Sequence, residues 1–124
     1  MRVFVSGKVG DEERVRDLIN HLTALGHDVT FDWTAVPHLK PYERNHAASA
    51  RTAALEVDGV KQSDIVIVLA HEDGIGMYVE LGIALGTGKQ VYIVSKGSSR
   101  SMFFHHPLVT IVNSIDDVLT RLNG

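Results

Sequence analysis

The sequence predicts a three-layer α/β domain, a flavodoxin-like or Rossmann-like fold in which a five-stranded parallel sheet of order 2-1-3-4-5 lies between helices. Strand-like and helix-like segments alternate along the chain, which is typical of a parallel sheet covered by helices. The segment 64–70, DIVIVLA, is almost wholly apolar, as a central strand buried on both faces should be. Right-handed crossovers with one reversal of winding then give the strand order.

The first half of the chain begins with a strand at 2–6, RVFVS, whose β-branched and aromatic residues predict burial. After a turn at 7–10, Asp11 is expected to cap a helix with one apolar face, and Gly26 is expected to end it. The other elements predicted in this half are a strand at 27–31, a loop with two prolines at 32–43 and an alanine-rich helix at 45–62.

The second half is built around the glycine-rich stretch 74–89, GIGMYVELGIALGTGK, which follows the central strand. The apolar residues of its expected buried helix face recur at helical spacing: Met77, Leu81, Ala84 and Leu85. Gly82 and Gly86 each cost the helix about 1 kcal/mol relative to alanine, so close approach by another backbone or by a ligand is expected there. The remaining elements are a strand at 90–94, a loop at 96–107, a strand at 109–112 and a helix at 115–122.

Length and composition predict one domain, 1–124, with an ordinary core. The net charge of −3 argues against a nucleic-acid polymer or an anionic membrane as the main partner, and the apolar runs are too short to span a membrane. The sequence has no cysteine and its seven histidines lack zinc-site spacing, so no metal or other cofactor is expected. The chain enters a strand at once without a signal peptide, which favours a cytoplasmic protein.

The candidate reactive group is Glu80, in the helix of the glycine-rich stretch. It is expected in about the first turn, where the positive end of the helix dipole would favour the ionised carboxylate. An ionised carboxylate beside a glycine-lined loop at the carboxyl edge of the sheet is what a carboxylate nucleophile requires. The alternative is that Glu80 only caps the helix or interacts with its dipole.

Other candidate binding residues follow the strands at the same edge of the predicted sheet. The turn with Ser6, Gly7 and Lys8 could hold a phosphate, although three acidic residues follow it and a plain turn is the alternative. Asp32 and Trp33 could hold a nucleobase by hydrogen bonding and stacking, or could simply cap and pack the loop. The candidates in the glycine-rich approach are Asp73, Gly74, Gly76 and Met77.

The segment 58–94 resembles the nucleoside 2-deoxyribosyltransferase family, which includes the 2'-deoxynucleoside 5'-monophosphate N-hydrolases. Its pattern is a helix, an apolar strand, a glycine-rich stretch and then the motif E-[LI]-G-x-A-x-x-x-x-K, which this chain matches at Glu80, Leu81, Gly82, Ala84 and Lys89. The resemblance implies that Glu80 attacks the anomeric carbon of a nucleoside and displaces the base, as the nucleophile of a retaining glycosidase does.

The resemblance also implies roles for other residues. Glu56 stands where the family has an acid that protonates the leaving base, but simple helix geometry places it far from the mouth of the site, and a solvated glutamate is the alternative. Ser101 matches a small polar residue supplied by a neighbouring subunit, which implies a homodimer or larger homo-oligomer with shared sites. Phe4 replaces a family tyrosine whose hydroxyl reaches the nucleophile, so that hydrogen bond is expected to be missing.

Three functions follow as hypotheses, each with a small-molecule nucleoside or nucleotide as ligand. The first is transfer of a deoxyribosyl group from a 2'-deoxynucleoside to another nucleobase. The second is hydrolysis of a 2'-deoxynucleoside 5'-monophosphate, with water as the acceptor. The third is a module that binds a nucleotide and catalyses nothing, since one fold hosts many functions.

Overall fold

The computed structural model describes residues 1–97 and 99–123, so Ser98, in the loop predicted at 96–107, and Gly124 lie outside the described residues. The sheet has five parallel strands in the order β2-β1-β3-β4-β5, as the sequence predicts. The strands are β1 (Arg2–Ser6), β2 (Asp28–Val29), β3 (Ile65–Leu69), β4 (Gln90–Val94) and β5 (Val109–Val112).

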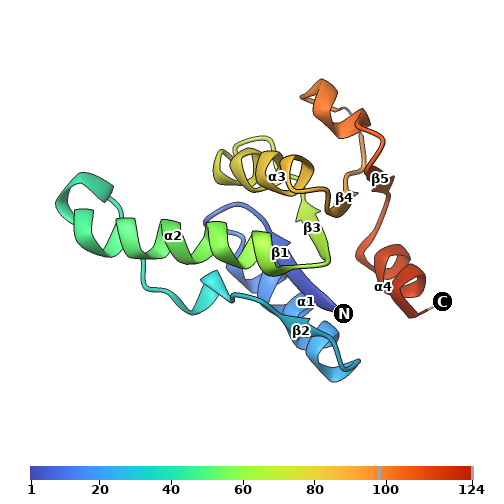
Figure 1. Ribbon diagram of the computed structural model, residues 1–124, viewed down its shortest axis with the longest axis horizontal. Coiled ribbons are helices and arrows are strands. Elements are labelled where there is room, and N and C mark those ends of the chain that lie inside the picture. Colours follow the sequence, from blue (N-terminus) through green and yellow to red (C-terminus); the bar gives the residue numbers. More distant parts are fainter. Residues whose placement is uncertain (98, 124) are drawn as a thin grey trace.

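Four α-helices cover the sheet: α1 (Glu12–Ala24), α2 (His46–Gln62), α3 (Gly76–Gly86) and α4 (Ile115–Asn123). Helices α2 and α3 pack on one face and against each other, whereas α1 and α4 pack on the other face (Figure 1). The described parts of the loops contain three short 3-10 helices: η1 (Trp33–Ala35), η2 (Tyr42–Arg44) and η3 (Met102–His105). All five residues of β3 are buried, as expected for a central strand. No helix in the described part of the chain is both long and apolar enough to cross a membrane.

Two local expectations need correction. Asp11 precedes α1, but its side chain caps no backbone N–H; instead the Glu12 carboxylate accepts a hydrogen bond of 2.9 Å from the Gly10 N–H. The second strand is Asp28–Val29 rather than 27–31, because the chain leaves the sheet edge after Thr30. Gly26 has the expected role, since its φ of 89° lets the chain turn after α1.

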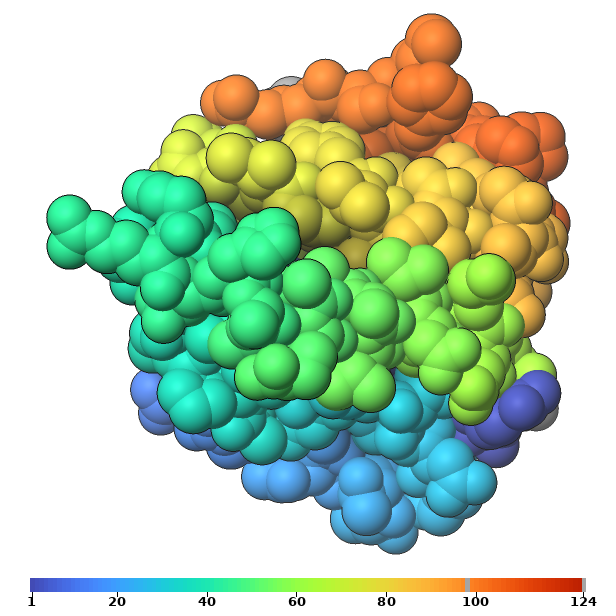
Figure 2. Space-filling model, turned by 60° about the vertical axis from the view of Figure 1, so that its left-hand side comes forward, coloured from blue at the N-terminus to red at the C-terminus, as the bar shows by residue number. Residues whose placement is uncertain are grey.

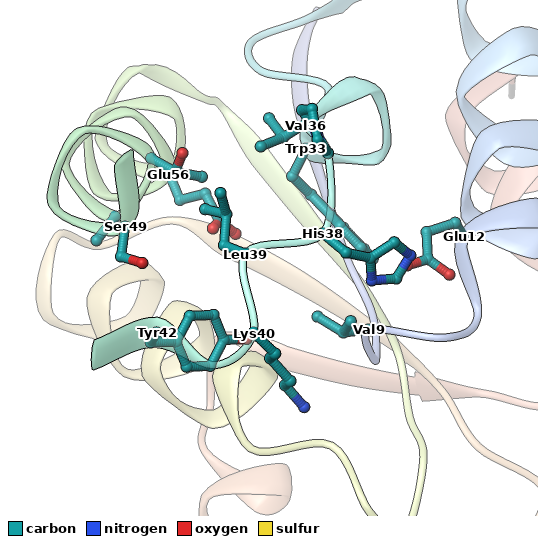
Figure 3. Close-up of a pocket in the computed structure, with 13 residues that line it drawn as sticks. Val9, Glu12, Trp33, Val36, His38, Leu39, Lys40, Tyr42, Ser49 and Glu56 are labelled. Carbon is teal, nitrogen blue, oxygen red and sulfur yellow. The ribbon is translucent and has the colours of Figure 1, made fainter. Parts of the chain in front are cut away.

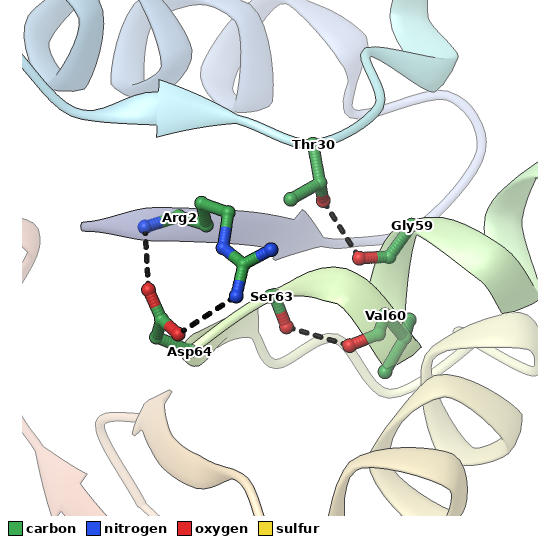
Figure 4. Close-up of polar contacts among 6 residues, drawn as sticks. All are labelled: Arg2, Thr30, Gly59, Val60, Ser63 and Asp64. Carbon is green, nitrogen blue, oxygen red and sulfur yellow. Dashed lines mark hydrogen bonds and ion pairs between the residues drawn. The ribbon is translucent and has the colours of Figure 1, made fainter.

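Close contact between α2 and β1 sets the depth of the site. A Cβ atom added to Gly59 of α2 would lie 2.9 Å from Cβ of Phe31 and 3.2 Å from the Phe4 ring, so only glycine allows this approach. The Thr30 hydroxyl donates to the Gly59 carbonyl oxygen at 2.7 Å and fixes the helix there (Figure 4). Gly82 and Gly86 differ, because a Cβ atom at either meets nothing within 4 Å; the close approach expected there does not come from this chain.

The core lies on both faces of β1, β3 and β4 and is almost entirely apolar. Phe4 is its largest fully buried side chain. The predicted buried face of α3 is confirmed, since Met77, Leu81 and Ala84 are buried and Leu85 packs against the core. Among the described residues, four polar or charged side chains are also buried: Ser6, Thr34, Ser63 and Glu80. Two of these four, Ser6 and Glu80, bond to each other.

Candidate active site

Two adjoining cavities open at the carboxyl edge of the sheet, between α2, α3 and the loop after β2. We call the first, of about 350 Å³, the aromatic pocket. Its lining residues are Val9, Glu12, Trp33, Val36, Pro37, His38, Leu39, Lys40, Tyr42, Ser49, Thr52, Ala53 and Glu56 (Figure 3). We call the second, of about 360 Å³, the carboxylate pocket. It is lined by Gly7, Lys8, Val9, Trp33, Lys40, Tyr42, Glu56, Asp73, Ile75, Gly76 and Glu80. Both volumes are in the range of small-molecule sites.

Glu80 is held inside the protein rather than in solvent. It lies on α3 and its side chain is 7% exposed, which is unusual for a glutamate. The Ser6 hydroxyl, at the carboxyl end of β1, donates a hydrogen bond of 2.5 Å to Oε1 of Glu80. The Phe4 side chain supplies no hydroxyl, as expected, and a different residue of the first strand, Ser6, provides one.

The expected position of Glu80, in about the first turn of its helix, needs correction. The first turn of α3 contains no acidic residue, so Glu80 lies beyond the turn where the helix dipole acts most strongly. Burial raises the pKa of Glu80 well above its ordinary value of 4.5, and the adjacent Glu56 carboxyl raises it further, whereas the Ser6 hydrogen bond opposes both. Burial and Glu56 therefore oppose the ionised form of Glu80 that a nucleophile requires, and the Ser6 hydrogen bond supports it.

Glu56 lies beside Glu80, contrary to the simple helix geometry that places it away from the mouth. It lines both pockets and is close enough to share a hydrogen bond with the Glu80 carboxyl. The close packing of α2 at Gly59, about one turn further along the helix, brings this side chain to the site. Two carboxyl groups in unequal environments are the usual arrangement for one acid and one nucleophile.

The loop after β2 forms the aromatic wall. Trp33 is buried, its Nε1 donates to the Val5 carbonyl oxygen at 2.8 Å, and its ring lines both pockets. Asp32 lines neither pocket, and its carboxylate accepts hydrogen bonds from the Thr34 backbone and hydroxyl. The structure thus has Asp32 in the loop-capping arrangement, which was the alternative to nucleobase binding.

The predicted glycine-rich approach lies at the carboxylate pocket. Gly7, Lys8, Asp73 and Gly76 line it directly. Gly74 and Met77 are buried behind this wall: a Cβ atom on Gly74 would lie 2.7 Å from Sδ of Met77, so these two residues shape the loop rather than its surface.

Ser101 lies apart from both pockets. It lines a third cavity of about 610 Å³, which lies between α3 and η3, and its hydroxyl oxygen accepts a hydrogen bond from the Phe103 N–H. In Figure 2 the segment around η3, in orange, runs along the far side of α3, in yellow, away from α2. Within this chain Ser101 therefore does not join the site of Glu80.

The sequence analysis missed several pocket-lining residues of the loop after β2, which was predicted at 32–43. Leu39, Lys40 and Tyr42 line the aromatic pocket, and Nζ of Lys40 lies 5.9 Å from the centre of the Tyr42 ring. The length and composition of this loop were the available signal, since long loops at this edge often carry binding residues. The residues described, 1–97 and 99–123, contain no group of three histidine, cysteine or acidic side chains able to hold a metal ion.

Comparison with known proteins agrees with this fold. The sequence matches the family model described as nucleoside 2-deoxyribosyltransferase over residues 4–113. No curated protein matches the sequence. Among solved structures, the CMP N-glycosidase BcmB of Clostridium botulinum is similar, with a TM-score of 0.66, 21% identity, and coverage of 99% of this chain and 98% of that chain. At that identity the structural likeness shows a shared fold.

Proposed function

Because the chain belongs to the nucleoside 2-deoxyribosyltransferase family, we propose that it cleaves the N-glycosidic bond of a nucleoside or nucleotide through a covalent glycosyl intermediate on Glu80. The observation that carries this proposal is the buried Glu80 carboxyl, held by Ser6 and adjacent to a second carboxyl, Glu56. Family members act on nucleosides, and an oxygen nucleophile paired with an acid is what glycosidic cleavage with retention requires.

The two pockets suggest how the substrate lies. The nucleobase would occupy the aromatic pocket, against Trp33 and Tyr42, and the pentose would occupy the carboxylate pocket, with C1' at Glu80. Glu56, which lines both pockets, would then lie near the glycosidic bond that joins base and sugar.

The reaction follows in two steps. The ionised Glu80 carboxylate forms a bond to C1' while the C1'–N bond breaks, and Glu56 gives its proton to the departing base. An acceptor then attacks C1' and breaks the ester to Glu80, while Glu56 takes the proton of the acceptor. Since each step inverts C1', the product has the configuration of the substrate.

The first acceptor we propose is another nucleobase, which makes the protein a deoxyribosyltransferase. Both bases would use the aromatic pocket in turn, and its opening between α2 and the loop after β2 allows the exchange. The family description supports this candidate.

A second candidate is hydrolysis of a nucleoside 5'-monophosphate, and specific side chains favour it. Lys8 and Lys40 line the carboxylate pocket, where a 5'-phosphate would lie beyond the pentose. The solved structure similar in fold is described as a CMP N-glycosidase, an enzyme that cleaves a nucleotide. Asp73, in the same pocket, opposes an anion and limits this support.

A direct assay distinguishes these candidates. The protein would be incubated with deoxynucleosides, deoxynucleoside 5'-monophosphates or CMP, with and without a second free base, and the products separated by chromatography. Base release that requires the second base indicates transfer, and release without it indicates hydrolysis. Mass spectrometry of a quenched reaction should find the sugar on the peptide containing Glu80. Saturable binding without turnover of any substrate would refute both enzymatic candidates.

We also propose that a second copy of the chain packs at the cavity between α3 and η3. Met102 and Phe103 are 78% and 53% exposed there, which is unusual for apolar side chains that are neighbours in sequence. Ser101 lines the same cavity, so a partner would bury it. This arrangement would let Ser101 act in the site of another subunit, as the family resemblance implies.

A further inference from the structure

Ser6, in β1 of the sheet, contacts the Glu80 carboxyl on the helix that packs above it. Residues alternate between the two faces of a strand, so Phe4 and Ser6 of β1 point to the same face. Phe4 contacts Gly59 of α2, and Ser6, one strand repeat further, reaches Glu80 of α3. The serine side chain is fully buried, and its hydroxyl hydrogen is committed to Oε1 of Glu80 at 2.5 Å.

The strength of this hydrogen bond depends on whether the Glu80 carboxyl is ionised. A hydroxyl donates more strongly to a carboxylate than to a neutral carboxylic acid, and the 2.5 Å separation is at the short end of the range for such charge-assisted bonds. Glu56 approaches the Glu80 carboxyl within reach of a shared proton. The Ser6 bond therefore stabilises the ionised form of Glu80, which burial and the Glu56 carboxyl disfavour.

Other charged groups also lie near Glu80. Lys8, Lys40 and Asp73 line the same pocket, but burial and Glu56 are the effects that raise the pKa of Glu80 and Ser6 is the one that lowers it. Among these effects, the Ser6 hydrogen bond is thus the one that favours the ionised Glu80 carboxylate.

We propose that Ser6 is a positioning residue for glycosidic cleavage: its hydroxyl fixes the orientation of the Glu80 carboxyl and favours the ionised form that attacks the sugar. This inference rests on the proposed function of Glu80 as nucleophile. With Oε1 held by Ser6, the oxygen that forms the bond to C1' would be Oε2. The hydroxyl takes no proton and gives none during the reaction, so it appears in neither product.

The test compares Ser6→Ala with Ser63→Ala. Ser63 is a matched control because it is also fully buried, and its hydroxyl donates at 2.7 Å to the Val60 carbonyl oxygen, away from both pockets (Figure 4). Each variant loses one buried hydroxyl bond, so thermal melts should show a loss of stability in both, and the loss should be at least as large in Ser6→Ala. Single-turnover cleavage of the best substrate would then be measured from pH 4 to 9, together with KM.

Ser6→Ala should slow the single-turnover rate by about 10-fold or more at neutral pH, with little change in KM, since a bond to a charged group is lost at the reacting carboxylate. The acidic limb of its rate–pH profile should move to higher pH. Ser63→Ala should keep the wild-type rate and profile, and Ser6→Thr, which retains the hydroxyl, should restore most of both. A normal rate and profile in Ser6→Ala, or a rise in KM alone, would overturn the proposal.

A second readout does not depend on turnover. NMR titration of the Glu80 carboxyl carbon should show a higher pKa in Ser6→Ala than in wild type and no change in Ser63→Ala. If wild type cleaves nothing yet the Glu80 titration moves as stated, the proposed function fails while the contact between Ser6 and Glu80 stands. If the titration is unchanged in Ser6→Ala, the inference about Ser6 is wrong whatever the enzyme does.

Discussion

Gly59 of α2 lies against the ring of Phe4 in β1 so closely that an added Cβ atom would be 3.2 Å from Cδ2 of that ring. This contact sets how near α2 comes to the sheet, and Glu56 on the same helix reaches the carboxylate pocket as a result. Packing at one glycine in the core thus supports the pairing of two carboxyl groups in the site.

Gly59→Ala should destabilise the protein by about 1–3 kcal/mol, because the crowding against Phe4 and Phe31 outweighs the better helix propensity of alanine. Gly82→Ala is the control, since its Cβ meets nothing within 4 Å and should stabilise the helix by about 0.5–1 kcal/mol. Urea denaturation of dilute protein measures both. Equal effects of the same sign would contradict the close packing of α2.

Glu80→Gln should remove turnover yet stabilise the fold at neutral pH. The pKa of Glu80 is raised in the folded protein, so above pH 4.5 the folded state binds more protons than the unfolded state and stability falls as pH rises. Glutamine avoids this loss and can still accept from Ser6. The gain should be present at pH 7 and should vanish near pH 4, below the ordinary pKa of a glutamate. Melts across pH measure it, with the exposed Glu43→Gln as control.

Cleavage in the wild type should speed up with pH along a limb whose apparent pKa lies above 4.5, because the raised pKa of Glu80 keeps part of it protonated at mildly acid pH. Single-turnover rates across pH give this limb. A rate already constant from pH 4.5 upward would show that Glu80 is ionised throughout, contrary to its burial.

Glu56→Gln should slow cleavage most for bases that leave poorly, since glutamine cannot protonate the departing nitrogen. Substrates whose bases leave readily as anions should recover much of the rate in this variant, whereas Glu80→Gln should stay inactive with them. Replacing the Glu56 carboxyl should also move the acidic limb of the rate–pH profile to lower pH, because that carboxyl raises the pKa of Glu80. Equal slowing of good and poor leaving groups would contradict the role of Glu56 as acid.

Lys40→Met and Lys8→Met should raise KM for a nucleoside 5'-monophosphate about 10-fold while leaving KM for the nucleoside nearly unchanged, if a phosphate lies beside them. Lys61→Met, an exposed change at the far end of α2, is the control. Steady-state kinetics with matched nucleoside and nucleotide pairs measure the difference. A parallel change for both substrates would place the phosphate elsewhere.

Much of the fold and several residues that line the site could be predicted from the sequence. The parallel sheet, its order and the buried face of α3 follow from hydrophobic spacing and turn residues, which are local properties of the chain. The position of Asp32 could not be decided in the same way. Its carboxylate bonds either to Thr34 or to a ligand, and only the conformation of the loop chooses between them.

The sequence by itself determined that this is a doubly wound α/β chain of a recognisable family with Glu80 at the carboxyl edge of its sheet, because strand order and edge follow from the pattern of elements. Only the tertiary structure decided that Ser6 bonds to Glu80, that Glu56 lies beside it, and that burial favours its protonated form. These facts depend on how closely helices from distant parts of the chain pack on the sheet, and no local pattern encodes that distance.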